Sequence, residues 1–286
     1  MDFLYKVDYK LCSILNRVSS NRCFSFEGVL MRYVRRLSLR INKNYPPVDK
    51  RENEGNDIVW VFWAQGEKRM PPLIRSCYES IKRHALGKVN LISLDSIEDF
   101  VHLPSFVYEK IQTKAISYTQ LSDILRFALL RDYGGWWLDA TIFLIEDLPR
   151  TTGLFTIKNA FNDSCISKFR WSSFLWHLSP HHPLAHFVYE GLIQYWKKND
   201  FAVEYLLIDY FIKYHYDHAP SFRQEIDNLS ENNPDLYFFQ SDAASKSFDQ
   251  ASWDRIKKST TIFKTSYKVG IENAPPDSYC KRLLFE

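Results

Sequence analysis

The sequence is poor in the features that mark secreted, membrane-spanning or nucleic-acid-binding proteins. Its five cysteines are odd in number and scattered, without a C-x-x-C pair, which indicates free thiols in a reducing compartment. The net charge of +3 is too small to predict a nucleic-acid partner. No uncharged apolar stretch approaches the ~18 residues that span a bilayer, and the first residues lack the pattern of a secretory signal. We therefore expect a cytoplasmic protein.

The composition is that of a globular protein rich in aromatic residues. A chain of 286 residues can form one large α/β domain or two small ones, with a sizeable core. Hydrophobic residues make up 45% and charged residues 25%, which is ordinary for a soluble domain. Aromatic residues reach 16%. Aromatic faces often bind sugars, although aromatic cores are commoner, so composition alone leaves both interpretations open.

The first part of the chain is basic. Residues 1–45 contain nine Lys and Arg against Asp2, Asp8 and Glu27. Helical spacing of apolar residues predicts an amphipathic helix from Phe26 to Ile41, with Leu30, Val34, Leu37 and Ile41 on its apolar side and Arg32, Arg35, Arg36 and Arg40 elsewhere. Such a helix can lie in an anionic membrane surface, or it can pack on the domain and leave its basic side in solvent. Both alternatives are open.

The rest of the chain alternates predicted strands and helices. Residues 46–56 are polar and contain Pro46-Pro47, as in a linker, so we expect a catalytic domain over 57–286. Strands are expected at 58–63, 89–94, 136–142 and 260–267, and helices at 72–84, 119–132, 182–198 and 203–216. Residues 219–249 are polar and are expected to form a lid or a long surface loop. This order predicts a mostly parallel α/β sheet, which binds ligands at the carboxyl ends of its strands.

The centre of the chain contains the most informative pattern. Asp123 and Arg126 lie three residues apart on a predicted helix, so they project from one face. A Gly134-Gly135 turn follows, and then an apolar strand that ends near Asp139. Charges of both signs beside a strand end suit a ligand with hydroxyls and phosphates, such as a nucleotide sugar. The alternative is that Asp123 and Arg126 form a buried ion pair that only fixes the helix.

Five groups of residues together resemble the capsular polysaccharide synthesis protein family, whose members are bacterial glycosyltransferases related to the sugar-binding DXD-motif transferases. The central group joins Ser122-Asp123-x-x-Arg126 to Tyr133-Gly134-Gly135-x-x-x-Asp139. The outer groups are Trp60 to Gly66 with Met70-Pro71 and Cys77-x-x-Ser80-Ile81, His182-Pro183-Leu184 with Tyr195-Trp196, Tyr205 to Tyr210, and Phe263-Lys264-x-x-Tyr267-Lys268. The resemblance spans residues ~57–270.

The resemblance implies a fold and an activity. The fold would be glycosyltransferase-A, a Rossmann-like and mostly parallel sheet with flanking helices and a helical second half. The activity would be transfer of a hexose from a nucleotide sugar, such as a UDP-sugar, to a surface-polysaccharide acceptor of a capsule or lipopolysaccharide, with retention of anomeric configuration. The acceptor would be a glycan or a lipid-linked glycan. The enzyme would then work at the cytoplasmic face of the cell membrane, as a peripheral protein.

The same resemblance suggests roles for individual residues. Asp139 corresponds to the first acid of the Asp-x-Asp motif and is our expected ligand for Mn²⁺ or Mg²⁺, but Thr141 stands at the second acid, and a hydroxyl is a poorer ligand for a hard cation. Either Asp209, Asp217 or a histidine completes the metal site, or the phosphate charge falls to Lys264, Lys268 or Arg126. The expected substrate-binding residues are Trp63, Gln65, Gly66, Asp123, Arg126, Trp137, Thr141, Lys264 and Lys268.

Asp209 is the second expected catalytic residue. It lies on an otherwise apolar helix, where an unpaired carboxylate is costly, and it could face the donor sugar. The alternative places it on the wet side of the helix. Two other functions compete with glycosyl transfer: a membrane-surface scaffold that has lost turnover, which Thr141 favours, and a transferase that moves a sugar phosphate.

Overall fold

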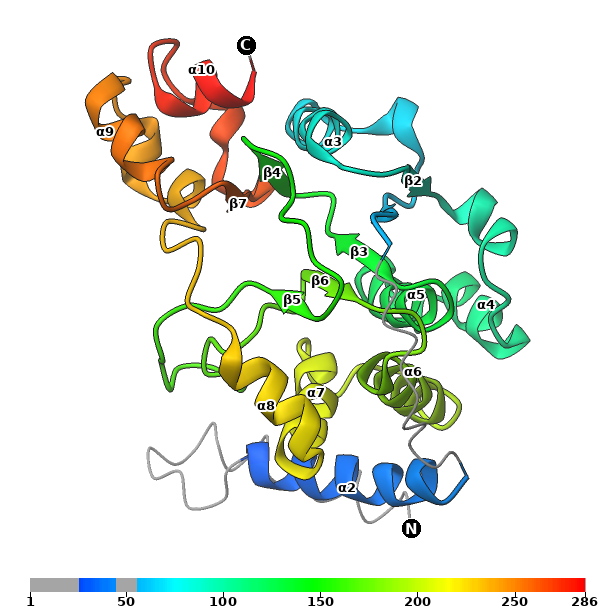
Figure 1. Ribbon diagram of the computed structural model, residues 1–286. Helices are drawn as coiled ribbons and strands as arrows, with labels where there is room; N and C mark the ends of the chain where they lie inside the picture. Colours follow the sequence, from blue (N-terminus) through cyan, green and yellow to red (C-terminus); the bar gives the residue numbers. More distant parts are fainter. Residues whose placement is uncertain (1–25, 45–55, 286) are drawn as a thin grey trace, which may run out of the picture.

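The computed structural model describes residues 26–44 and 56–285, and its centre is a five-stranded sheet with the order β2-β1-β3-β6-β5 (Figure 1). Strand β1 (Val59–Phe62) runs parallel to β2 (Val89–Ile92) and to β3 (Gly135–Leu138). Strand β6 (Leu175–Leu178) is antiparallel to both of its neighbours, β3 and β5 (Phe155–Thr156). Four of the five strands therefore point the same way, which confirms a mixed α/β protein with a mainly parallel sheet.

Helices cover both faces of this sheet because its central strands are apolar on both sides. In β1, Val59 and Val61 pack into one core cluster with α3 (Pro72–His84), whereas Trp60 and Phe62 pack into another with α5 (Tyr118–Asp132). Helix α6 (Pro183–Trp196) lies against α5 as an outer layer. The predicted buried strand and the predicted helices at 72–84, 119–132 and 182–198 are thus confirmed.

The remaining elements form a second, separate sheet and further helices. The second sheet pairs β4 (Ile142–Leu144) with β7 (Ile262–Lys264) in antiparallel fashion, and a third core cluster lies beside it. The other helices are α4 (Ser105–Gln112), α7 (Leu207–His218), α8 (Pro220–Asn228), α9 (Gln250–Ile256) and α10 (Tyr279–Leu284). Short 3-10 helices complete the path: Glu67–Arg69, Leu94–Asp99, Phe238–Gln240, Asp242–Ser245, Tyr267–Val269 and Ile271–Asn273. The second half is predominantly helical, as expected.

Two sequence-based expectations about elements are wrong, and two strands were missed. The strand predicted over 136–142 is two strands in different sheets, because the chain turns at Asp139, whose carbonyl accepts a 2.9 Å hydrogen bond from the amide of Ile142. Residues 219–249 are not one lid or loop: they include α8, whose Phe222 and Ile226 are buried. Strands β5 and β6 were not expected at all.

The basic N-terminal helix is α2 (Phe26–Asn44), and it packs on the domain. Its predicted apolar side faces α6 and α7 beneath the sheet (Figure 1), where Leu30, Val34, Leu37 and Ile41 are buried in the same cluster as α5. Arg32, Arg35 and Arg36 are exposed. This is the second of the two arrangements that the sequence left open. Residues 1–25 and most of the predicted linker lie outside the described residues, and within the described part no helix is long and apolar enough to cross a membrane.

Candidate functional site

A cavity of about 660 Å³ opens where β1 and β3 end. The residues that follow β1 and those that follow β3 line one side of it, as the rule for parallel strands predicts. Helices α5 and α7, the segment that precedes β6, the residues around Phe238–Gln240 and the end of β7 with the segment after it line the rest. The cavity therefore brings together parts of the chain that the sequence separates by more than a hundred residues.

Two glycines, one directly before β3 and one at its first position, place Asp139 at this rim. Gly134 and Gly135 both have positive φ, at 65° and 86°, a region that other residues rarely adopt. A Cβ on Gly134 would lie 2.5 Å from the Pro180 nitrogen, and one on Gly135 would lie 2.4 Å from the Ile58 carbonyl oxygen. Strand β3 can pair closely with its neighbours because neither side chain is present, and the chain then delivers Asp139 directly after the strand.

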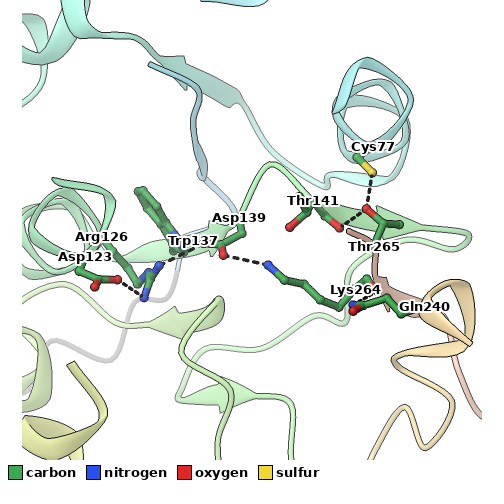
Figure 2. A network of polar contacts seen from close by, with 9 residues as sticks. All are labelled: Cys77, Asp123, Arg126, Trp137, Asp139, Thr141, Gln240, Lys264 and Thr265. Carbon is green, nitrogen blue, oxygen red and sulfur yellow. Dashed lines mark hydrogen bonds and ion pairs between the residues drawn. The ribbon is translucent and has the colours of Figure 1, made fainter. Parts of the chain in front are cut away.

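Asp139 is the centre of a charged network (Figure 2). Its Oδ1 accepts hydrogen bonds from Arg126 Nη2 at 3.1 Å and from Trp137 Nε1 at 3.0 Å, and its Oδ2 accepts one from Lys264 Nζ at 2.9 Å. Arg126 Nη1 also lies 3.1 Å from Asp123 Oδ1. The helical Asp–Arg couple and the strand-end carboxylate thus share one network at the wall of one cavity.

Lys264 reaches Asp139 because of the second sheet. In the β4–β7 register, Lys264 lies opposite Ile142. The next residue, Thr265, donates its backbone amide and its hydroxyl to the Thr141 carbonyl, both at 2.9 Å. The ammonium of Lys264 also lies 4.5 Å from the centre of the Phe174 ring, a favourable position for a cation. These contacts hold a cation at the cavity wall.

The three carboxyl groups of the site differ in their protonation. Burial raises the pKa of Asp123 to about 7, although Arg126 opposes the shift. Burial also raises the pKa of Asp209 to about 6, against the hydrogen bond that Trp171 Nε1 donates to it at 3.0 Å. Burial acts in the same direction on Asp139, but Lys264 and Arg126 outweigh it and hold its pKa below the ordinary value. Asp139 is therefore the permanent anion among the three.

The donor set does not fit a resident divalent cation. Among residues 26–44 and 56–285, no three His, Cys, Asp or Glu side chains converge on one point. Asp139 already faces two protein cations, Thr141 offers a hydroxyl where an acid was needed, and Asp209 already accepts a hydrogen bond from Trp171 Nε1. Asp217 pairs with Lys213 and does not line the cavity.

Nine of the eleven predicted site residues line the cavity: Trp63, Gln65, Asp123, Arg126, Asp139, Thr141, Asp209, Lys264 and Lys268. Gly66 and Trp137 are not among the lining residues. Gly66 forms the turn next to Gln65, with φ at 76°. Trp137 is 0% exposed, so it cannot stack on a ligand here; its indole instead orients Asp139. Asp209 lies on the cavity side of α7, which excludes the wet-side alternative.

Sequence reasoning missed several residues of the site. Phe174 and Trp171 precede β6, a strand that we did not predict, and they contact Lys264 and Asp209. Exposed tyrosines also surround the cavity: Tyr118, Tyr205, Tyr237 and Tyr267 both line it and leave much of their rings in solvent. Tyr205 and Tyr267 stand in motifs that carry the family resemblance, but we predicted no role for them, and Tyr118 and Tyr237 stand in none of these motifs.

A family model agrees with the resemblance in the motifs. The family model described as "Capsular polysaccharide synthesis protein" matches residues 13–283. The search of curated proteins found no match. Among solved structures, the chain is similar to one described as "PaToxG Glycosyltransferase", with 16% sequence identity and a TM-score of 0.44, over 71% of this chain and 82% of that one.

Proposed function

Because the chain belongs to the capsular polysaccharide synthesis protein family, we propose that it is a glycosyltransferase that moves a sugar from a nucleotide sugar to a surface-polysaccharide acceptor. The observation that supports this most is the convergence of Asp139, the Asp123–Arg126 couple and Lys264 on one cavity. A volume of about 660 Å³ is in the range of small-molecule sites. The glycosyltransferase-A topology and retention of configuration belong to this proposal.

In the proposed reaction, the residues that line the cavity have separate roles. The cations Arg126 and Lys264 face the diphosphate, and Gln65 and Trp63 contact the nucleotide. The bond between the anomeric carbon and the diphosphate oxygen breaks, and its electron pair stays on that oxygen. The acceptor oxygen forms the new bond, and its proton passes to the leaving phosphate. Asp209 faces the donor sugar, where a carboxylate stabilises positive charge that develops at the ring.

The rim of the cavity suits a glycan acceptor. Tyr118, Tyr205, Tyr237 and Tyr267 present exposed rings around the opening, and a tyrosine offers both an apolar face and a hydroxyl at little entropic cost. Sugar rings have the same combination of apolar faces and hydroxyls. An acceptor with several sugars, free or lipid-linked, would contact this rim while its terminal hydroxyl enters the cavity.

Asp139→Asn tests the proposed centre. The amide keeps the shape but removes the charge that orients Arg126 and Lys264, so we expect at least a ~100-fold loss of turnover. The measurement is release of nucleoside diphosphate from a panel of UDP-, GDP- and ADP-sugars, first narrowed by thermal shift of the wild-type protein. Asp147→Asn is the matched control, because Asp147 is exposed and lies outside the cavity. Wild-type turnover in Asp139→Asn would contradict the assignment.

The same assay separates two other functions. A scaffold that has lost turnover would release no nucleotide from any donor with any acceptor, with or without Mn²⁺. A sugar-phosphate transferase would give a product that retains the phosphate, which mass spectrometry detects as an added phosphate mass. Thr141 favours the first of these, and the intact charged network around Asp139 argues against it.

We also propose that the enzyme works on the cytoplasmic face of the membrane. The support is the basic side of α2, where Arg32, Arg35 and Arg36 are exposed while the apolar side packs on the domain. Such a surface binds anionic headgroups by charge. A lipid-linked acceptor would then be presented at the membrane.

A further inference from the structure

The charge around Asp139 leads to an inference about how the donor is held, and it rests on the proposed function. A strand-end acid in a nucleotide-sugar site is expected to bind a divalent cation. Here both oxygens of Asp139 already accept hydrogen bonds from protein groups on three elements: Arg126 on α5, Trp137 on β3 and Lys264 on β7. An entering cation would have to displace at least the Lys264 ammonium.

The other oxygen ligands that an octahedral Mg²⁺ or Mn²⁺ would need are also missing. Thr141 supplies a neutral hydroxyl, and its carbonyl already accepts two hydrogen bonds from Thr265. Asp123 is buried against Arg126, and Asp209 accepts the indole hydrogen of Trp171. Among the described residues that line the cavity, there is no acid besides these two aspartates and Asp139, and no histidine.

Two protein cations lie where a bound divalent cation would otherwise supply positive charge. The ammonium of Lys264 lines the cavity, its side chain is 17% exposed, and Asp139 on one side and Phe174 on the other fix its position. Arg126, 4% exposed, lies on the other side of Asp139 and donates a hydrogen bond to its Oδ1 (Figure 2). Asp139 cancels one of these two charges, and Lys268 adds a third cation to the lining of the cavity.

We propose that Lys264, oriented by Asp139 and supported by Arg126, neutralises the diphosphate of the donor, so that donor binding and transfer require no divalent cation. In the transfer step the ammonium donates a hydrogen bond to the diphosphate oxygen that receives the electron pair of the broken bond. Lys264 is then the residue that stabilises the leaving group, and Asp139 is the residue that positions it.

Titration calorimetry of the full chain with UDP, GDP, ADP and dTDP tests this inference. The protein is freed of metal by chelation and measured with chelator and with Mn²⁺. We expect the dissociation constant of the nucleotide that binds to agree within about twofold between the measurement with chelator and the measurement with Mn²⁺. Lys264→Gln should weaken binding roughly 10- to 100-fold, as for loss of a hydrogen bond between charged groups. Lys264→Arg should recover part of the loss because it keeps the charge.

Lys246→Gln is the control, since Lys246 is exposed and outside this cavity, and it should bind like the wild type. Circular dichroism melting of each variant separates lost binding from lost folding. Binding that requires Mn²⁺, or unchanged affinity in Lys264→Gln, would overturn this inference and leave the proposed function standing. If no nucleoside diphosphate or nucleotide sugar binds in either condition, the proposed function fails with it.

Discussion

The three aspartates of the cavity differ in pKa because they differ in their hydrogen-bond donors and neighbouring charges. Asp139 meets two cations and an indole hydrogen, so it remains an anion despite its burial. Asp123 and Asp209 are buried with fewer compensating donors, and their pKa values rise to about 7 and about 6. The cavity thus contains one constant negative charge and two that depend on pH near neutrality.

The raised pKa of Asp123 predicts a pH dependence of stability. Between about pH 4 and pH 7 the folded protein keeps a proton on Asp123 that the unfolded chain has released, so the free energy of unfolding falls as the pH rises through this interval. Asp123→Asn removes this cost. Urea unfolding at pH 5 and pH 8 should therefore show the variant gaining stability relative to wild type at the higher pH. Asp99→Asn, at an exposed site, should show no such change; a pH-independent difference for Asp123→Asn would contradict the prediction.

At the scale of elements, α2 is a structural part of the domain. Its sequence fits a helix on a membrane as well as one on a protein, since an apolar side beside a basic one suits both. The decisive contacts are with α6 and α7, where the apolar side is buried. Removing residues 1–45 would therefore uncover the core beneath α2, and point substitutions are the cleaner probe of its role.

Two leucines two positions apart on α2 test this packing. Leu37 is 3% exposed and Leu39 is 58% exposed. Leu37→Ala should lower the free energy of unfolding by about 2–4 kcal/mol, because it removes buried contacts and leaves a cavity. Leu39→Ala should change it by less than about 0.5 kcal/mol. Chemical unfolding measures both, and equal effects would show that α2 does not pack as described.

At the scale of the whole molecule, α2 packs its apolar side on the domain and exposes Arg32, Arg35 and Arg36 on the surface. Joint replacement of Arg32, Arg35 and Arg36 by Gln should weaken binding to vesicles with anionic lipids roughly 100-fold, since each surface cation contributes about 1 kcal/mol. Vesicle co-sedimentation measures this. The fold should not change, because all three side chains are exposed.

A matched triple variant controls for net charge. Arg255, Lys257 and Lys258 are equally exposed but lie at α9, so their replacement by Gln should leave vesicle binding near the wild-type level. If both triple variants bind alike, or if the wild type does not distinguish anionic from neutral vesicles, the proposed membrane contact is wrong.

The candidate site was largely visible in the chain because its main residues lie close together in sequence. Asp123 and Arg126 are one helical turn apart, and the Gly134-Gly135 turn joins their helix to Asp139. Trp137 was wrongly predicted to bind the substrate, because the sequence alone does not show whether an aromatic residue two positions before Asp139 lies in the core or in the cavity. Burial on the inner side of β3 decided for the core. The sequence alone could not decide the role of α2 at a membrane or the binding of a metal ion, because both depend on which residues surround a side chain in the folded protein.

The sequence by itself determined the features that depend on residues close together in the chain. These are the helical spacing of α2 and α5, the apolar strand β1, and the glycine turn that leads to Asp139. Only the tertiary structure decided that Lys264, 125 residues away, would meet Asp139, that the strand over 136–142 would divide between two sheets, and that Trp171 would bind Asp209. The physical reason is that side-chain spacing follows from local backbone geometry, whereas strand register and the partner of a buried charge depend on how distant segments pack.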